Sequence, residues 1–368
     1  MPFFIVIVLL TYILGNVYVF VRGIHAFGQM LTFIRTVIAI VYFVCSLLPF
    51  AFFFLRNAKS VPFSVGHFIY QFGTSWLFFV LYMVIFLAAT DLFRLFNRNF
   101  SYGFIISFVL TICLFIYGYI NAKHVNKQVF NININKPTDE TNALKIVAIS
   151  DWHLGLGSTK TAINNVISMI NQEKPDVILI AGDLIDSSVQ PVISQQMDKD
   201  LNRLEAKEGI FMVPGNHDYM SGIEACKQWI RNTKVVLLMD SLVTLPSGLQ
   251  IIGRDDLSNH RRMSVADWKN ITDRNKPTIL LDHQPYRLED AQTIGADLQI
   301  SGHTHHGQII PISWLTDYLF EISYGFAKRE DTNYYVSSGV SLWGPPFRIG
   351  TNSEIAVFNV TFESPSKP

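Results

Sequence analysis

The sequence predicts an α/β domain that follows an all-α membrane region of four helices. Two observations support this prediction. The long apolar runs lie in the first third of the 368 residues, whereas the acidic residues gather in the remainder. Past residue 142, short β-branched or aliphatic runs stop at Asp, Asn or His, often beside a glycine, and stretches with helical spacing lie between them. This alternation is typical of an α/β fold with polar side chains at the strand ends.

The formal net charge is zero because two unlike parts of the chain cancel. Up to residue 142 there are nine Lys or Arg and three Asp or Glu, and the rest has twenty and twenty-six. A nuclease normally carries a basic track for the phosphate backbone. The acidic C-terminal part therefore argues against a nucleic-acid partner. The three cysteines lack the spacing of a metal site.

Four apolar runs are long enough to cross the ~30 Å hydrocarbon core of a bilayer as helices. They cover residues 3–21, 36–55, 68–90 and 102–120. The first run lacks a basic start and an A-x-A-like cleavage site, and three more runs follow it, which argues against a secretory signal. No ionisable residue lies deep inside the runs, whereas a transporter usually needs one. The runs are therefore interpreted as a membrane anchor.

The composition predicts three parts along the chain. Residues 1–122 form the transmembrane region, which places the protein in the cell membrane as a multi-pass protein with the lipid bilayer as its partner. Residues 123–142 are polar and Asn-rich and are interpreted as a linker. Residues 143–368 form the α/β domain.

The side of the membrane on which the domain lies is only weakly marked. Four spans place the first residues and the domain on the same side. The positive charges that would share this side are Arg56, Lys59, Lys123 and Lys127. Those opposite are Arg22, Arg94 and Arg98, with Arg35 if it lies outside its span. The positive-inside rule thus gives a nearly even count, and we favour a cytoplasmic domain.

The strands of the domain are predicted from short apolar runs that each stop at a polar residue. These runs cover residues 143–150, 175–181, 209–213, 278–281 and 297–301. Helical spacing is found over residues 161–172 and 190–207. Further strands, expected to belong to a second sheet, cover residues 249–253, 334–337 and 354–362.

The polar segments at the strand ends predict a two-metal site. They contain Asp151 and His153, Asp183, Asn216 and His217, His283, and His303 and His305. Carboxylate oxygen, amide oxygen and imidazole nitrogen all bind first-row transition metals. A lone His on a strand is more often a buried core residue, but five such segments are poorly explained by coincidence. Two metals a few Å apart activate water for attack on phosphorus, so the chain is predicted to hydrolyse a phosphoester or pyrophosphate.

The order Asp-x-His, Gly-Asp-x-x-Asp, Gly-Asn-His-Asp, His and Gly-His-x-His resembles the calcineurin-like metallophosphoesterase superfamily over residues 144–361. The Gly-His-Thr-His sequence that begins at Gly302, and the Pro-Phe-Arg-Ile-Gly sequence that begins at Pro346, resemble its membrane-associated bacterial branch. That branch usually has glycine at the position of His306. We expect the His306 ring to face solvent rather than to narrow the pocket.

The resemblance implies a four-layer α/β/β/α sandwich and a dinuclear site. One metal would be held by Asp151, His153, Asp183 and His305, and the other by Asp183, Asn216, His283 and His303. A hydroxide bridging the metals would be the nucleophile. His217 would stabilise phosphoryl oxygens or protonate the leaving group, and Asp218 would orient its ring. Manganese, iron or zinc fits these ligands better than calcium.

Asp186 is predicted to lie beside the ligands. Arg254, with the basic residues 260–262 that follow it, could grip a second phosphate of the substrate or belong to a solvated loop, and Arg348 could likewise contact substrate. The aromatic residues Trp314, Trp343 and Phe347 could form an apolar lip for a lipid chain, although core packing is the simpler interpretation.

The substrate implied by the resemblance is lipid-linked, for example UDP-2,3-diacylglucosamine, which would place the protein in lipid metabolism. A phosphodiesterase or protein phosphatase acting on a soluble substrate is the alternative. A non-catalytic, metal-stabilised scaffold is disfavoured because every ligand position and His217 are filled.

Overall fold

The computed structural model describes residues 2–55, 61–138 and 141–363. Contacts within the chain define two compact units. The first unit is Met1–Ile120 with Gly344–Pro346, and the second is Asn121–Trp343 with Phe347–Pro368. Arg56 and Lys59, which entered the argument about orientation, lie outside the described residues.

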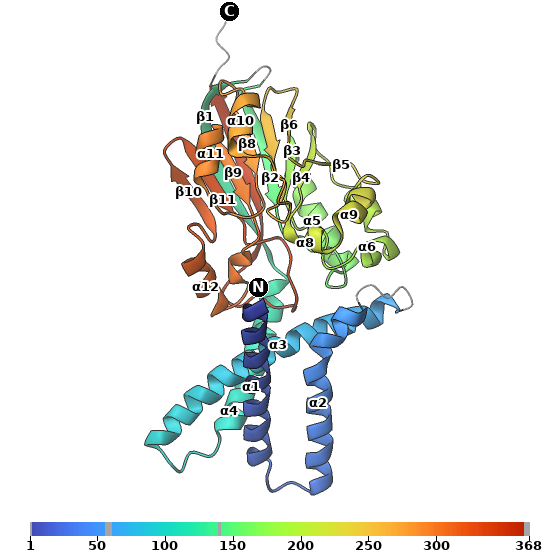
Figure 1. Ribbon diagram of the computed structural model, residues 1–368, viewed down its shortest axis with the longest axis vertical. Coiled ribbons are helices and arrows are strands. Elements are labelled where there is room, and N and C mark those ends of the chain that lie inside the picture. The colour runs from blue at the N-terminus through green and yellow to red at the C-terminus, as the bar shows by residue number, and fades with distance from the viewer. Residues whose placement is uncertain (1, 56–60, 139–140, 364–368) are drawn as a thin grey trace, which may run out of the picture. The chain divides into compact units, whose positions relative to one another are not determined.

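The first unit consists of four helices, drawn in blue to teal in Figure 1. They are α1 (Pro2–Ala26), α2 (Thr32–Leu55), α3 (Phe63–Phe96) and α4 (Gly103–Ala122). All four are long and apolar enough to cross a membrane, by length and composition. The prediction of four such helices is therefore confirmed. Helix α3 is longer than its apolar run, with 34 residues.

The extra turns of α3 bring an acidic residue into the helical unit. Asp91 pairs with Arg22 of α1 at 2.5 Å and accepts a hydrogen bond from Tyr18 at 2.6 Å. Deeper in the unit, the side-chain oxygen of Asn16 accepts hydrogen bonds from the Trp76 indole at 3.1 Å and from the hydroxyl of Tyr42 at 3.2 Å. These polar groups are paired with one another, as packed apolar helices require.

The second unit contains two six-stranded sheets. The first sheet has the order β1 (Val125–Pro137), β12 (Ser353–Glu363), β2 (Ala143–Ile149), β3 (Val177–Ala181), β4 (Gly209–Val213) and β5 (Val235–Leu237). All neighbours in it are parallel except β12 and β2. The second sheet has the order β10 (Gly325–Arg329), β11 (Thr332–Val336), β9 (Leu298–Ser301), β8 (Thr278–Leu281), β7 (Gln250–Gly253) and β6 (Ser241–Thr244). Its inner pairs are parallel and its two outer pairs antiparallel.

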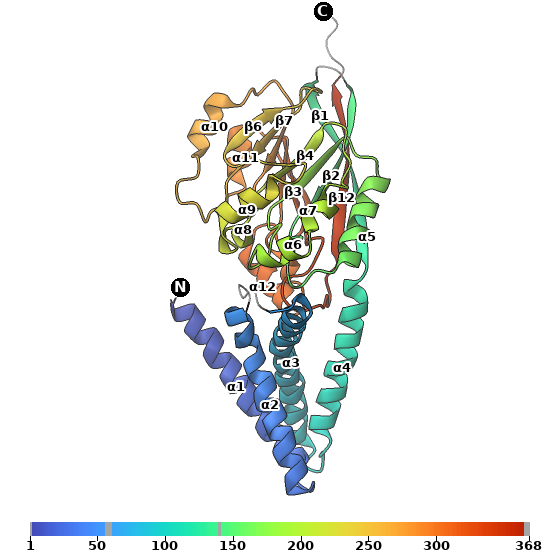
Figure 2. The same ribbon diagram turned by 90° about the vertical axis from the view of Figure 1, so that its right-hand side faces the viewer.

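The two sheets pack face to face through a buried apolar layer. Ile146 and Leu179 of the first sheet belong to the same core cluster as Ile279 and Ile300 of the second. Another cluster joins the outer face of the first sheet to four helices, α5 (Lys160–Gln172), α6 (Gln190–Ser194), α7 (Met197–Leu201) and α9 (Ile223–Ile230). Helices α10 (Val265–Ile271) and α11 (Glu289–Ile294) cover the second sheet (Figure 2). The predicted four-layer α/β/β/α architecture is confirmed.

The segment interpreted as a linker is part of the first sheet. Strand β1 occupies Val125–Pro137 and pairs in parallel with β12. Ile132 and Ile134 are buried, whereas the asparagines on either side of them are exposed. Asparagine is rare in strands, so the composition concealed a period-two alternation that marks an edge strand. Strand β12, expected in the second sheet, also belongs to the first.

The single helix expected over residues 190–207 is two short helices instead. Gln196, between α6 and α7, has φ of 51°. A left-handed residue cannot continue a right-handed helix, so the chain breaks there. Residues 202–207 then run into turns and coil ahead of β4.

Candidate metal centre

The predicted ligands lie at the carboxyl ends of parallel strands from both sheets. Asp151 and His153 follow β2, and Asp183 follows β3. Asn216 and His217 begin the short helix α8 (Asn216–Met220), which follows β4. On the second sheet, His283 follows β8 and His303 follows β9, while His305 begins a 3₁₀ turn, η1 (His305–Gly307). Because the sheets are stacked, these loops meet at one edge of the sandwich.

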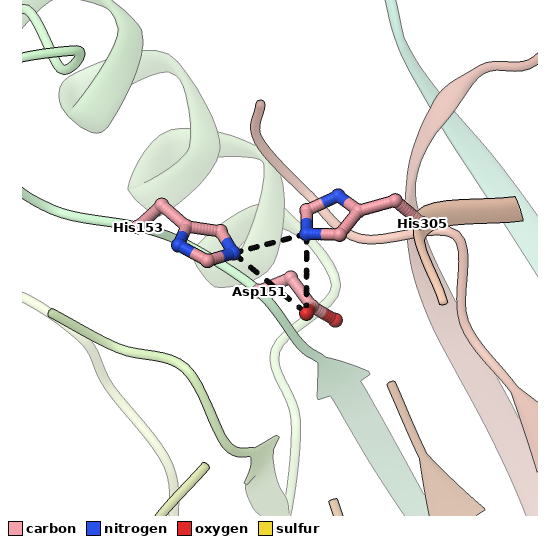
Figure 3. A group of neighbouring side chains, drawn as sticks. All are labelled: Asp151, His153 and His305. Carbon is pink, nitrogen blue, oxygen red and sulfur yellow. Dashed lines mark hydrogen bonds and ion pairs between the residues drawn. The ribbon is translucent and has the colours of Figure 1, made fainter. Parts of the chain in front are cut away.

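One group of side chains joins the two sheets through Asp151, His153 and His305 (Figure 3). The Nε2 atoms of the two histidines are 2.9 Å apart. The Oδ1 atom of Asp151 is 3.3 Å from Nε2 of His305 and 3.8 Å from Nε2 of His153. All three side chains are buried. Three donor atoms therefore point at one small volume.

A second group adjoins the first through Asp183. The Oδ2 atom of Asp183 is 3.8 Å from Nε2 of His153 and 3.1 Å from Nε2 of His283. The Nδ1 atom of His303 is 2.9 Å from the side-chain oxygen of Asn216, and its ring centroid is 5.3 Å from that of His283. The structure thus brings all seven predicted ligands together. Their assignment as ligands stays a prediction.

The spacing and chemistry of these atoms fit a metal. Ligand atoms at right angles around a metal ~2.1 Å away are about 3 Å apart, close to the shorter separations seen here. The Nε2 atom of His283 is buried and accepts or donates no hydrogen bond among the described residues. The Nδ1 atom of His283 lies 2.7 Å from the carbonyl oxygen of Ala181, which orients the ring with Nε2 toward the centre.

The backbone at the site adopts a conformation that side chains with a Cβ rarely take. Five of the seven predicted ligands have positive φ, between 46° and 72°. They are Asp151, His153, Asp183, His303 and His305. Such residues cost free energy on folding and cluster at functional sites, where the surrounding structure holds them in place. The backbone of the strand-end loops therefore directs these side chains toward the centre.

Two glycines leave space that the aspartates occupy. A Cβ atom on Gly215 would lie 2.2 Å from Oδ1 of Asp183, and one on Gly302 would lie 2.2 Å from Oδ2 of Asp151. Neither distance is compatible with a non-bonded contact. Gly215 therefore permits the close approach of two loops of the first sheet, and Gly302 permits that of loops from opposite sheets.

The carboxylate that orients His217 is Asp186, which corrects the prediction for Asp218. The Nδ1 atom of His217 is 2.9 Å from Oδ1 of Asp186. Asp218 accepts hydrogen bonds from the backbone amides of Gly215 at 2.9 Å and Ile185 at 2.9 Å. Through these hydrogen bonds Asp218 connects the loop after β3 to the loop after β4. Its side chain points away from the ring of His217.

Because Asp186 orients His217 and Asp218 connects two loops, replacing each carboxylate should have a different effect. Asp186→Asn is expected to lower turnover about 10- to 100-fold with little loss of bound metal, because the His217 ring loses its orienting partner. Asp218→Asn is expected to lower thermal stability and metal content instead, because an amide cannot accept hydrogen bonds through both of its ends. Turnover, metal content and unfolding temperature measured on both variants test this. Equal losses of turnover at parental stability would contradict it.

The pKa values of the four histidines among the predicted ligands fall into two classes, raised and lowered. Burial alone would lower the pKa of His153, but Asp151 and Asp186 raise it to about 10. Burial is likewise outweighed at His283, whose pKa lies well above its ordinary value because of Asp183. Burial and the charge of His283 lower the pKa of His303 to about 4. Burial also holds the pKa of His305 well below its ordinary value.

Metal uptake at pH 7 is therefore expected to release about two protons, because metals bind neutral imidazole. Without metal, His153 and His283 are protonated at this pH, and His303 and His305 are not. Metal affinity should also fall as the pH is lowered. Calorimetric titration of the stripped protein in two buffers of different ionisation enthalpy measures the proton count. The same apparent heat in both buffers would exclude the release.

The two arginines predicted as substrate contacts are buried in the domain. Arg254 donates to Asp282 at 3.1 Å and to Asp290 at 2.9 Å. Arg348 is fully buried and donates to the carbonyl oxygens of His305 at 2.9 Å and Ser338 at 2.6 Å. Both guanidinium groups are held by these partners and thereby keep neighbouring residues in place.

The ring of His306 is partly exposed and turned toward a neighbouring acid. Its Nε2 atom is 3.2 Å from Asp317, and its ring is stacked on Tyr324 with centroids 4.8 Å apart. Its φ of 48° is in the left-handed region. Glycine takes this conformation at no steric cost, whereas a residue with a Cβ atom, such as histidine, is strained in it.

Aromatic side chains surround the rim of the centre, and most were not singled out from the sequence. The Trp343 ring is 5.6 Å from that of His217, and Trp343 is 52% exposed. The Phe320 ring is 5.9 Å from that of His303 and 4.9 Å from that of Tyr286. Phe347, proposed for the same lip, is buried. Nothing in the spacing of Tyr286 or Phe320 separates them from ordinary core aromatics.

The calcineurin-like phosphoesterase family model matches residues 144–307 of the chain. An uncharacterized metallophosphoesterase of Campylobacter jejuni is 32% identical over 268 residues, which cover 70% of this chain and 69% of that protein. One from Helicobacter pylori is 37% identical over 219 residues, 58% of each chain. The zebrafish "transmembrane protein with metallophosphoesterase domain" is 31% identical, over 68% of this chain and 61% of that protein.

Among solved structures, a Thermus thermophilus 5′-nucleotidase precursor matches over 59% of this chain and 55% of that chain, at 13% identity and a TM-score of 0.37. A likeness this low says nothing about substrate.

Proposed function

Because this chain belongs to the calcineurin-like metallophosphoesterase family, we propose that it is a membrane-anchored hydrolase of phosphoesters or pyrophosphates. The proposal rests on the seven predicted metal ligands, whose side chains meet at one edge of the two sheets. They are Asp151, His153, Asp183, Asn216, His283, His303 and His305. The alignment with the Helicobacter protein covers 58% of that relative's length, so activity and substrate rest on the site itself.

The chain's own residues prepare the site for in-line attack on phosphorus. Two divalent metals bound here would supply the Lewis acidity that activates water and neutralises phosphoryl charge. Asp186 holds Nδ1 of His217 at 2.9 Å, which fixes the ring so that its Nε2 atom is available to the phosphoryl group or the leaving oxygen. The ring of His217 lies edge-on to that of His153, at 4.7 Å, so it is positioned beside the predicted ligands.

We propose that the substrate is amphiphilic and lipid-linked because of helix α12 (Ile312–Leu319), labelled in Figure 1. Four of its large apolar side chains are more than half exposed, namely Trp314, Leu315, Tyr318 and Leu319. The helix runs directly into Phe320, whose ring contacts His303. An exposed apolar surface that reaches a reaction centre is suited to holding a hydrocarbon chain.

Hydrolysis by the full-length protein, stripped of metal and reloaded with manganese, iron or zinc, tests the proposal. Bis-p-nitrophenyl phosphate reports the chemistry, and a UDP-diacylglucosamine reports the lipid preference. Metal-dependent turnover of both is expected, with a lower KM for the acylated substrate. Absence of turnover with either substrate, in protein that holds two metals, would refute the proposed activity.

The lipid assignment has its own test in the double variant Trp314→Ser/Leu319→Ser. It should raise KM for the acylated substrate about tenfold and leave bis-p-nitrophenyl phosphate unaffected, since roughly 1.4 kcal/mol of apolar contact is lost. Ile271→Ser removes an apolar side chain from α10 that is also more than half exposed, and it is the matched control. Equal KM values in the parent and the double variant would favour a phosphodiesterase or phosphatase with a soluble substrate.

We also infer that the domain faces the cytoplasm. The inference rests on the basic residues Lys123 and Lys127 directly after the fourth apolar helix. A reporter that is active only in the cytoplasm, fused after residue 368 of the chain, tests it. Activity only of an exported reporter would reverse the orientation.

A further inference from the structure

A pocket of about 350 Å³ adjoins the loop that carries His283. Its walls come from two stretches of the second sheet's loops, residues 254–265 and 282–290. Asp282, directly before His283, is one of its lining residues, and so is Tyr286. The Tyr286 ring is 6.3 Å from the ring of His303. The pocket therefore lies beside the candidate metal centre, within the same unit of the chain.

The lining of this pocket carries more positive than negative charge. Arg254, Arg262 and Arg287 line it together with two carboxylates, Asp282 and Asp290. Asp282 accepts hydrogen bonds from Arg254 at 3.1 Å and from Arg262 at 2.7 Å. The Arg287 side chain is 71% exposed and reaches Asp290 only at 3.7 Å. Two acids thus face three guanidinium groups.

Two of these arginines are largely shielded from solvent and keep an unused donor. The side chains of Arg254 and Arg262 are 6% and 10% exposed. In the described residues, the Nε atom of each is buried and has no hydrogen-bond partner. A buried N–H group without an acceptor is unfavourable, so nearly all such groups in folded proteins have one. The protein's own groups therefore do not use all the donors of these two arginines.

We propose that the pocket binds a phosphate group distinct from the one that is hydrolysed. Guanidinium groups match phosphate geometry with paired N–H donors, and the flexible Arg287 can fold over the group once it has entered. Arg262 and Arg287 contact the phosphate, and Arg254 positions Asp282 and Arg262 beneath it. The phosphate is either a second group on the substrate, which rests on the proposed function, or a free ion.

Binding of inorganic phosphate to the metal-stripped, full-length protein is the first test. Removing the metals removes the other place where phosphate would bind. Phosphate should raise the unfolding temperature of the parent, and the dissociation constant from this shift should be at least about tenfold weaker in Arg262→Gln and Arg287→Gln. Arg329→Gln, which removes a guanidinium paired with Glu321 at the surface, is the matched control and keeps the parental response.

Arg287→Gln keeps this test decisive if Arg262→Gln fails to fold, because Arg287 is largely exposed and its buried partner Asp290, 3.7 Å away, also accepts a hydrogen bond from Arg254 at 2.9 Å. A parent whose unfolding temperature does not respond to phosphate overturns the proposal. A response that persists in Arg287→Gln and in folded Arg262→Gln overturns it as well.

The source of the phosphate is decided with the metal-loaded protein and two esters. Thymidine 5′-(p-nitrophenyl phosphate) is compared with the same ester bearing a 3′-phosphate. For a substrate-borne group, the 3′-phosphate lowers KM about tenfold in the parent and not in Arg287→Gln. For a free ion, both esters have the same KM, and added phosphate changes both more in the parent than in Arg287→Gln, because phosphate bound at the metals acts equally in the two proteins. Failure to hydrolyse either ester counts against the proposed function, whereas the binding result with stripped protein stands by itself.

Discussion

Replacing Asp183 with alanine is expected to lower turnover of bis-p-nitrophenyl phosphate on the order of 10³-fold or more. This carboxylate is the one shared between the two groups of predicted ligands. Its Oδ2 atom is 3.1 Å from Nε2 of His283 and 3.8 Å from Nε2 of His153. Its Oδ1 atom accepts a hydrogen bond from the backbone amide of His217 at 2.7 Å. Loss of Asp183 therefore disturbs both groups and the start of helix α8 at once.

The experiment compares turnover, bound metal and secondary structure in Asp183→Ala and in the parent. Glu224→Ala is the control, because Glu224 is an exposed carboxylate on α9 that pairs with Lys227. The control should keep parental turnover and metal content. An Asp183→Ala protein that retained more than about a tenth of parental turnover would show that the proposed shared carboxylate is dispensable.

The second large effect is expected at Arg348, where Arg348→Met should lower the free energy of unfolding by about 3–5 kcal/mol. The guanidinium donates to the carbonyl oxygens of His305 at 2.9 Å, Ser338 at 2.6 Å and Ser341 at 2.8 Å. Burial lowers its pKa to about 10, so it remains charged at neutral pH. Methionine would fill the space and leave those carbonyl oxygens without their donor.

Denaturant unfolding of the metal-stripped, full-length protein, followed by tryptophan fluorescence, measures this loss. Arg348→Lys should recover only part of it, because an ammonium group cannot reach carbonyl oxygens on both sides as the guanidinium fork does. Arg329→Met, at a surface ion pair, should change stability by less than about 0.5 kcal/mol. A similarly small change in Arg348→Met would mean that the buried network contributes nothing net.

The strands that lead to the metal centre were predictable from the sequence because they are buried on both faces. Strands β4 and β8 begin and end where the apolar runs do, at residues 209–213 and 278–281. An inner parallel strand between two layers reads as an unbroken apolar run, and the first polar residue marks its end. For the same reason, the polar residues past these ends were recognisable as one site.

What the sequence could not reveal is the direction in which polar side chains point. Asp218 is the neighbour of His217 in sequence, yet the ring of His217 is oriented by Asp186, 31 residues away. Successive residues of a helical turn point about 100° apart, so adjacency is a poor guide to contact. The direction of the Arg254 and Arg348 side chains was equally hidden in the sequence. A cation near a site can face the substrate or can support the loops behind it. Only the packed structure distinguishes these possibilities.

Gly215 and Gly302 are positions that are constrained because a side chain cannot be accommodated there. Neither supplies an atom to the centre, and yet the smallest side chain at either would strike the carboxylate of Asp183 or Asp151. At these two positions the requirement is for space rather than for reactivity. A substitution map of the domain would therefore place them among the least tolerant positions, alongside residues whose chemistry they do not share.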